Sequence, residues 1–213
     1  MTHSQRIVLA IIKSLLSMFL RWKVNGMKNV PLNGALIVVA NHVHLVDPIL
    51  LMASFPRWIS FMAKEELFRY PFLGVIIRWG QAFTVRRRGT IKDRREAIKQ
   101  AKDVLSKGLA LGMFPEGKRN RVGRLLPGKP GSAVIASQTG TPLLPVGIIG
   151  TEKLKGMTWP WKRPAVVINI GQPFKLPPTN GRLVKSQTKS LTDFMMRQIA
   201  TLLPQENRGV YGD

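Results

Sequence analysis

Histidine is scarce in this sequence, which holds three histidines, at positions 3, 42 and 44, and no cysteine. Without cysteine there is no thiolate nucleophile, so any nucleophilic atom must be oxygen or nitrogen. Imidazole suits a general base near neutral pH, and His3 lies in a terminal tail. Asp47 follows His42 by five residues. A carboxylate there can hold one tautomer of the imidazole and stabilise the imidazolium, so the spacing predicts a base and the group that orients it.

Two other interpretations of these residues remain open at this point. Pro48 follows Asp47, and an aspartate before a proline is typical of a helix start. Asp47 would then only cap a helix, while His42 would only bond to a backbone carbonyl. Metal binding by His42 and His44 is less well supported, because no convincing third ligand accompanies them.

A second group of residues that could bind a ligand or take part in chemistry is the segment Phe114-Pro115-Glu116-Gly117-Lys118-Arg119-Asn120. Glycine lets the backbone approach a ligand closely, and the two adjacent cations can bind an anion such as phosphate. Glu116 can pair with one of these cations and fix its direction. Taken alone, the segment also fits an ordinary polar loop. More guanidinium groups stand at 86–88, and most of these three fit a solvated surface.

Both groups directly follow short apolar runs typical of buried strands, at 35–40 and 109–114. Ligand sites in open α/β sheets lie outside the carboxyl ends of such strands, so we expect the two groups at one sheet edge. Other patterns predict strands at 58–63, 82–85, 143–149 and 165–170, and helices at about 47–53, 65–79, 91–107, 132–138 and 184–203. This alternation predicts an α/β fold with a central, mostly parallel sheet flanked by helices on both faces.

The charge of the chain calls for an anionic partner. The 213 residues suit one domain, and 33 Lys and Arg against 11 Asp and Glu give a net charge of +22. Candidates are nucleic acid, an anionic membrane surface, an acidic protein or a phosphorylated substrate. No acid lies between Glu152 and Asp193, and Trp159 and Trp161 stand among lysines there, which favours a membrane face. Nucleic acid is disfavoured, because no recognisable DNA- or RNA-binding motif is present.

The N-terminal segment contains an apolar run at 7–20, interrupted by Lys13 and followed by Arg21-Trp22-Lys23. This run is too short to span a bilayer, and no small-residue cleavage site follows it. We expect residues 1–23 to form an amphipathic helix at the membrane interface and 24–213 to form the main domain. The protein would then be peripheral or monotopic on the cytoplasmic face of the cell membrane. The alternative is a core helix packed on the main domain.

Four motifs occur in a fixed order: Asn41-His42 with Asp47, Gly80-Gln81-Ala82-Phe83-Thr84-Val85-Arg86-Arg87, Phe114-Pro115-Glu116-Gly117, and Leu143-Leu144-Pro145-Val146. This order resembles the four blocks of the glycerolipid acyltransferases, in particular the bacterial 1-acylglycerol-3-phosphate acyltransferases. The resemblance covers about residues 24–173. It implies a glycerol-3-phosphate acyltransferase-like fold with the catalytic domain at 24–213.

The resemblance also implies a reaction. A fatty acyl group would move from a thioester of acyl carrier protein or coenzyme A to the 2-hydroxyl of lysophosphatidic acid, giving phosphatidic acid, with no metal or bound cofactor. His42 would take the hydroxyl proton and Asp47 would orient it. The implied substrate-binding residues are Glu116 and Gly117 at the acceptor site, Arg87 and Arg119 as basic residues of the second and third blocks, and Pro145 on the acyl-chain side.

The sequence departs from the commonest family pattern at three positions. Lys118 replaces a threonine or serine of the third block, Asn120 replaces a frequent serine, and Thr84 replaces a frequent proline. Lys118 adds charge near the acceptor phosphate and is therefore included among the expected substrate-binding residues. The same fold with another acceptor, glycerol 3-phosphate or a lyso-aminolipid, remains the alternative. His44 lies in the variable interior of the first block and is not expected to be catalytic.

Overall fold

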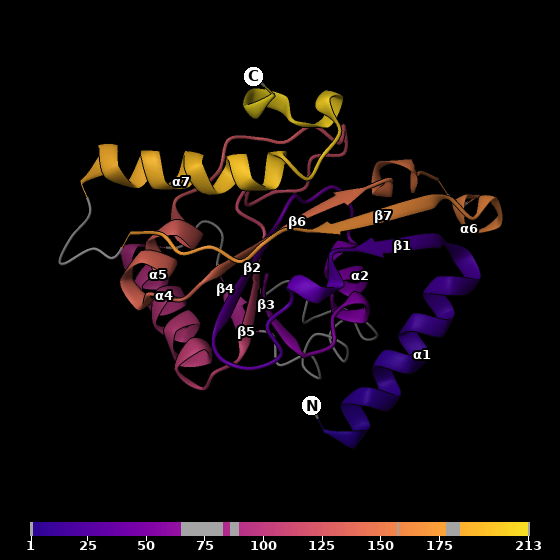
Figure 1. Ribbon diagram of the computed structural model, residues 1–213, viewed down its shortest axis with the longest axis horizontal. Helices are drawn as coiled ribbons and strands as arrows, with labels where there is room; N and C mark the ends of the chain where they lie inside the picture. Colours follow the sequence, from indigo (N-terminus) through magenta and orange to yellow (C-terminus); the bar gives the residue numbers. More distant parts are fainter. Residues whose placement is uncertain (1, 65–82, 86–89, 157, 178–183, 213) are drawn as a thin grey trace.

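One sheet organises the described part of the chain, which in this computed structural model comprises residues 2–64, 83–85, 90–156, 158–177 and 184–212 (Figure 1). Within these residues the strand order is β1-β7-β6-β2-β5-β3-β4, and all neighbouring strands are parallel except β6 and β7. The predicted mostly parallel α/β sheet is confirmed. The strands are β1 (Arg21–Asn25), β2 (Leu36–Ala40), β3 (Ile59–Lys64), β4 (Phe83–Val85), β5 (Ala110–Met113), β6 (Leu143–Ile149) and β7 (Ala165–Ile170).

Strand β2 lies at the centre of the sheet, and all five of its residues are buried. Alternate side chains of a strand point to opposite faces, and the two sets from β2 enter two separate hydrophobic cores. Leu36, Val38 and Ala40 belong to the core shared with α1 (His3–Phe19) and α2 (Asp47–Ser54). Ile37 and Val39 belong to the core on the other face, with α4 (Ile91–Ser106), α5 (Gly131–Thr139) and α7 (Lys185–Ala200). Helices therefore cover both faces, as predicted.

The remaining elements are short. Helix α6 spans Trp159–Lys162, and 3-10 turns lie at Met27–Asn29, Thr151–Lys153, Gln205–Asn207 and Gly209–Tyr211. Helix α4 begins where a threonine cap predicts, because the Thr90 hydroxyl and the Asp93 carboxylate bond to each other's backbone N–H. The predicted helix at 65–79 lies outside the described residues.

The N-terminal segment differs from the expectation of a single helix over residues 1–23. Helix α1 ends at Phe19, and Arg21–Asn25 form strand β1, which pairs in parallel with β7. Trp22 and Val24 alternate with polar residues and pack against the core that contains α1 and α2. The residues that follow the helix therefore join the sheet.

Helix α1 has two apolar sides. Leu9 is buried and Leu16 packs on the core, as expected for a core helix. Four other apolar side chains on the helix are about half exposed: Ile7, Ile11, Leu15 and Met18. We call these four residues the α1 stripe, because their spacing of four, four and three residues places them along one side of the helix. No helix among the described residues is long and apolar enough to cross a membrane.

Candidate active site

The two predicted groups meet at one edge of the sheet. His42 lies two residues after the end of β2, and Phe114 directly follows the adjacent parallel strand β5. Their segments are joined by backbone contacts, because the Asn120 N–H donates to the His42 carbonyl oxygen at 2.7 Å. The expectation that both groups share the carboxyl edge of the sheet is confirmed.

His42 and Asp47 form a hydrogen-bonded pair, with 2.9 Å between His42 Nδ1 and Asp47 Oδ2. The Asp47 side chain is fully buried, whereas 16% of the His42 side chain is exposed. The same Oδ2 atom also accepts the backbone N–H groups of Val43 and His44, each at 2.7 Å. An ionised carboxylate only accepts hydrogen bonds, so Nδ1 is the donor in this bond, and in the neutral imidazole Nε2 then carries the lone pair. This is the arrangement of a general base.

This geometry decides between the earlier interpretations of Asp47. Val46 is the N-cap of α2 and makes no side-chain cap bond, while Asp47 is the first helical residue. The Asp47 carboxylate therefore bonds to His42 and to the turn that precedes the helix. The interpretation in which Asp47 only caps a helix is wrong.

Glu116 holds the backbone of His42. Its side chain is 2% exposed, its Oε1 accepts the His42 N–H at 2.8 Å, and its Oε2 accepts the Leu126 N–H at 3.0 Å. Burial raises the pKa of Glu116 to about 7, against the opposing effect of these two N–H donors and of Lys118. Within the described residues Glu116 forms no ion pair, so the expected pairing with Lys118 or Arg119 is not found.

The imidazole ring and the preceding residue are also fixed. The ring of His42 stacks on Phe114 with a centroid distance of 4.1 Å and an interplanar angle of 21°. The side-chain amide of Asn41 accepts the Ile148 N–H at 2.7 Å and donates to the Ile148 carbonyl at 2.8 Å. This amide continues the pairing of β2 with β6 by one residue. His42 is therefore held through its ring, its own backbone and its neighbour.

His44 has a different environment from His42. Its Nδ1 accepts the Val46 N–H at 3.3 Å. Burial is the main reason why the pKa of His44 is lowered, and Arg119 and Arg121 lower it further, while Asp47 opposes them. His44 therefore accepts a hydrogen bond within the turn that precedes α2, and its exclusion from catalysis stays a prediction.

The other expected substrate-binding residues lie at different places. Gly117 adopts a φ of +65°, and a Cβ there would lie 2.8 Å from the Lys129 side chain, so this turn favours glycine. Lys118 and Arg119 are exposed on the loop that bonds to His42. Pro145 is buried in β6 beside Val39 and is directed toward the core of α4, α5 and α7, away from the core that contains α2. Arg87 lies outside the described residues.

Sequence reasoning missed two residues that hold the site. Asn41 was noted as part of a motif, yet its role depends on the backbone of Ile148, more than 100 residues away. Leu126 contributes only a backbone N–H, which no side-chain pattern reveals. The alternation of apolar residues across 21–25 was a readable signal for β1.

Comparison with known proteins places this geometry in a family. A family model described as Acyltransferase matches residues 21–149. The 1-acyl-sn-glycerol-3-phosphate acyltransferase of Borreliella burgdorferi is 35% identical over 130 residues, which cover 61% of this chain and 51% of that protein. The human lysophospholipid acyltransferase LPCAT4 is 29% identical over 193 residues, covering 89% of this chain and 33% of that protein.

A solved structure agrees with the sequence relatives. The 1-acyl-sn-glycerophosphate acyltransferase PlsC of Thermotoga maritima superposes with a TM-score of 0.67 and 31% identity, covering 93% of this chain and 80% of that chain. The chain spans about half, or less, of the length of the curated relatives given above. The family match takes in β1 through β6, including both motifs that form the site. By this match, this chain belongs to the acyltransferase family.

Proposed function

We propose that this chain is a 1-acyl-sn-glycerol-3-phosphate O-acyltransferase of phospholipid biosynthesis. The observation that carries the proposal is the 2.9 Å hydrogen bond between His42 Nδ1 and the buried carboxylate of Asp47. This bond leaves Nε2 of His42 to act as the base at the carboxyl edge of the sheet. A lipid hydroxyl is a very weak acid, so it needs such a base at the moment of attack.

The proposed reaction uses this base twice. The acceptor oxygen bonds to the thioester carbonyl carbon while its proton moves to Nε2 of His42. The resulting tetrahedral intermediate collapses by breaking its carbon–sulfur bond, and the leaving thiolate takes the proton back from the imidazolium. Asp47 stabilises the imidazolium between these two steps. The hydrogen bonds and ring contact of His42 hold the imidazole in one orientation throughout.

Lysophosphatidic acid is the proposed acceptor. Curated relatives from Borreliella burgdorferi and Cocos nucifera carry the name 1-acyl-sn-glycerol-3-phosphate acyltransferase. Arg119 and Lys118 are exposed on the loop that bonds to the His42 backbone, and these cations suit the acceptor phosphate. By the family resemblance, Arg87 shares this role and Pro145 lines the acyl-chain side. Glycerol 3-phosphate and a lyso-aminolipid are the competing acceptors.

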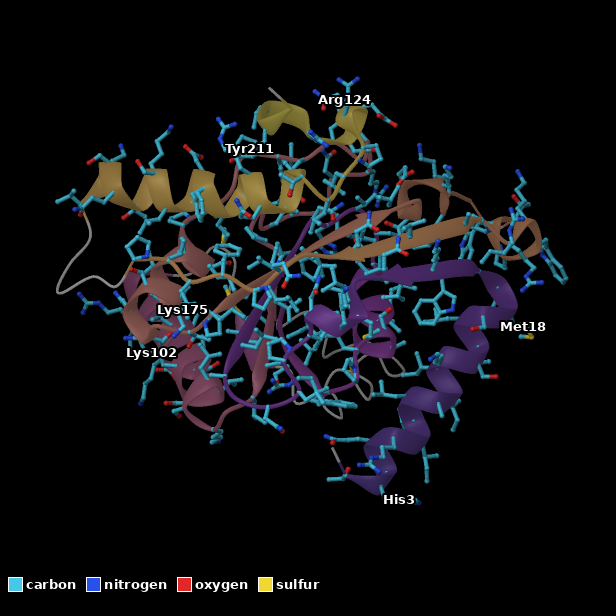
Figure 2. All side chains as sticks on the ribbon, viewed as in Figure 1. His3, Met18, Lys102, Arg124, Lys175 and Tyr211 are labelled. Carbon is cyan, nitrogen blue, oxygen red and sulfur yellow. The ribbon has the colours of Figure 1, made fainter. Side chains whose placement is uncertain are left out.

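Docking to an anionic membrane on its cytoplasmic face is the second part of the proposal. The α1 stripe exposes four apolar side chains, and Met18 points away from the rest of the molecule (Figure 2). Helix α6 lies beside the end of α1, because Arg163 Nη2 donates to the Ser17 carbonyl at 2.8 Å. Trp161 of helix α6 is 89% exposed and is followed by the basic residues Lys162 and Arg163. This combination of apolar side chains, tryptophan and cations supports interfacial binding.

The experiment is acyl transfer by the purified protein to lysophosphatidic acid in anionic vesicles, with acyl carrier protein and coenzyme A thioesters tested separately as donors. Glycerol 3-phosphate and a lyso-aminolipid serve as alternative acceptors, and His42→Ala runs alongside. Phosphatidic acid from the wild-type protein but not from His42→Ala supports the proposal. Product from another acceptor alone, or equal product from His42→Ala, contradicts it.

A further inference from the structure

The last residues of the chain lie against the loop that follows Glu116 (Figure 1). We call residues 115–129 the active-site loop and residues 205–211 the C-terminal clamp. The Leu125 N–H donates to the Asn207 carbonyl at 2.8 Å, and Asn207 Nδ2 donates to the Gly123 carbonyl at 2.9 Å. The clamp lies outside residues 21–149, the part of the chain that the family model matches. The match to the family model therefore does not include the clamp.

Tyr211 makes a second connection between the clamp and the loop. Its side chain is 7% exposed, its hydroxyl oxygen accepts the Gly128 N–H at 3.1 Å, and the hydroxyl donates to Asp193 Oδ1 of α7 at 3.4 Å. Tyr211 and Arg124 lie on the same side of the molecule in Figure 2. The hydroxyl thus ties the loop to a helix that packs on the sheet.

The clamp also approaches the loop too closely for most side chains. Gly209 has a φ of +56°, and a Cβ at this position would lie 2.1 Å from the Leu125 carbonyl oxygen. Glycine is required here for its conformation and for the space. At this contact the backbone of Gly209 therefore packs directly against the backbone of Leu125.

The loop joins the clamp to the base. Leu125 and Leu126 are consecutive, and their N–H groups have different partners: the first donates to Asn207 of the clamp, the second to Glu116 Oε2. The other oxygen of Glu116 accepts the His42 N–H. A continuous series of hydrogen bonds and covalent links thus runs from the clamp to the backbone of the base.

We infer that Asn207 and Tyr211 are positioning residues, which hold the active-site loop in the conformation that lets Glu116 fix His42. Neither residue touches the reacting atoms in this arrangement. They act through the loop, so their loss lowers turnover without removing a substrate contact. The part of this inference that concerns turnover rests on the proposed function, whereas the part that concerns the loop conformation does not.

The test combines amide hydrogen exchange with steady-state kinetics on Tyr211→Phe and Asn207→Ala of the full chain. Tyr211→Phe removes only the hydroxyl and keeps the buried ring. Thr201→Ala is the matched control, because its hydroxyl bonds to the Gln198 carbonyl and not to the loop. Each clamp variant should raise exchange at 123–128 at least about fivefold and lower kcat by a similar factor, with KM for both substrates unchanged. Asn207→Ala removes one hydrogen bond and Tyr211→Phe removes two, and one net bond corresponds to about this factor. The control should change neither quantity.

A double-mutant cycle separates positioning from general support. Glu116→Gln disturbs the link between the loop and His42, so Tyr211→Phe should add little further loss of kcat in that background. Additive losses would overturn the inference, as would exchange that rises uniformly over β5 and α4 or remains as in the wild type. If the wild-type protein transfers no acyl group, the proposed function fails. The role of the clamp in holding the loop is then tested by hydrogen exchange alone: faster exchange at 123–128 in the clamp variants supports it, and unchanged exchange overturns it.

Discussion

The Oε1 atom of Glu116 accepts the backbone N–H of His42 at 2.8 Å, across 74 residues of sequence. Asp47 binds the ring of the same histidine through Nδ1. Two buried acidic side chains therefore hold different parts of His42: Glu116 fixes its backbone and Asp47 fixes its imidazole ring. Their different environments lead to different predictions.

Glu116 should make stability depend on pH. Burial raises its pKa in the folded protein from 4.5 to about 7, so the folded state holds this proton more tightly than the unfolded state. The stabilisation is fully present below pH 4.5 and is lost as pH rises through about 7. We expect the free energy of unfolding of the wild type, relative to Glu116→Gln, to fall by about 2 to 3 kcal/mol between pH 5 and pH 8.

Denaturant unfolding of both proteins at several pH values measures this difference. Asp103→Asn is the control, because Asp103 is exposed on α4 and the substitution removes one carboxylate from the surface. A difference between the wild type and Glu116→Gln that stays constant from pH 5 to pH 8 would show that Glu116 is not the responsible group.

Asp47→Asn should abolish most turnover while the protein remains folded. The amide keeps the size of the carboxylate, and its oxygen can accept the three hydrogen bonds that Asp47 Oδ2 accepts. It carries no charge, however, so it cannot stabilise the imidazolium that forms when His42 takes the hydroxyl proton. We expect kcat to fall about 10³- to 10⁴-fold, as when the aspartate of a serine-protease triad is replaced, with little change in KM. Single-turnover kinetics measures the chemical step, and wild-type turnover in Asp47→Asn would remove Asp47 from the mechanism.

His44→Asn should retain activity within about threefold of the wild type. The asparagine oxygen can accept the N–H two residues later, as His44 Nδ1 does for Val46. The lowered pKa of His44 means that little positive charge is lost near neutral pH. Comparison of kcat with that of His42→Ala checks this assignment. A loss as large as that of His42→Ala would make His44 part of the catalytic apparatus.

Replacing Ile7, Ile11 and Leu15 of the α1 stripe with serine should weaken binding to anionic vesicles, by about tenfold for each side chain if each becomes fully buried in the bilayer. Turnover of a short-chain, water-soluble lysophosphatidic acid should be unchanged, because these side chains point away from the core. Vesicle sedimentation measures the binding. Val184→Ser is the control, since Val184 is 57% exposed but precedes α7. Unchanged binding of the triple variant would contradict the proposed membrane contact.

The sequence allowed prediction of most strands because each is a short, mostly apolar run. Strands β6 and β7 have the predicted bounds of 143–149 and 165–170. Strand β1 was missed because its residues were read as the flank of an apolar helix, although Trp22 and Val24 alternate with polar neighbours. Local pattern was sufficient for these mostly apolar strands and misleading for β1 at the edge of the sheet.

The pairing of His42 with Asp47 could be predicted because the two residues are five apart and the chemistry limits the residue types. The function of Glu116 could not be predicted in the same way. Its partners are backbone N–H groups, and one of them belongs to a segment 74 residues earlier. The position of Glu116 next to Lys118 and Arg119 suggests an ion pair. In the structure the Glu116 side chain is buried and accepts backbone N–H groups instead.

Strand β1 sits at one edge of the sheet and pairs only with β7 among the described strands, with Arg21 opposite Ala165. A ribosome adding about 5–20 residues per second needs roughly 7–28 seconds to make the chain between β1 and β7. During that time β1 has no strand to join, while α1, which precedes it, is already synthesised. The α1 stripe is thus synthesised before the sheet can close, so the proposed membrane contact could form before the fold is complete.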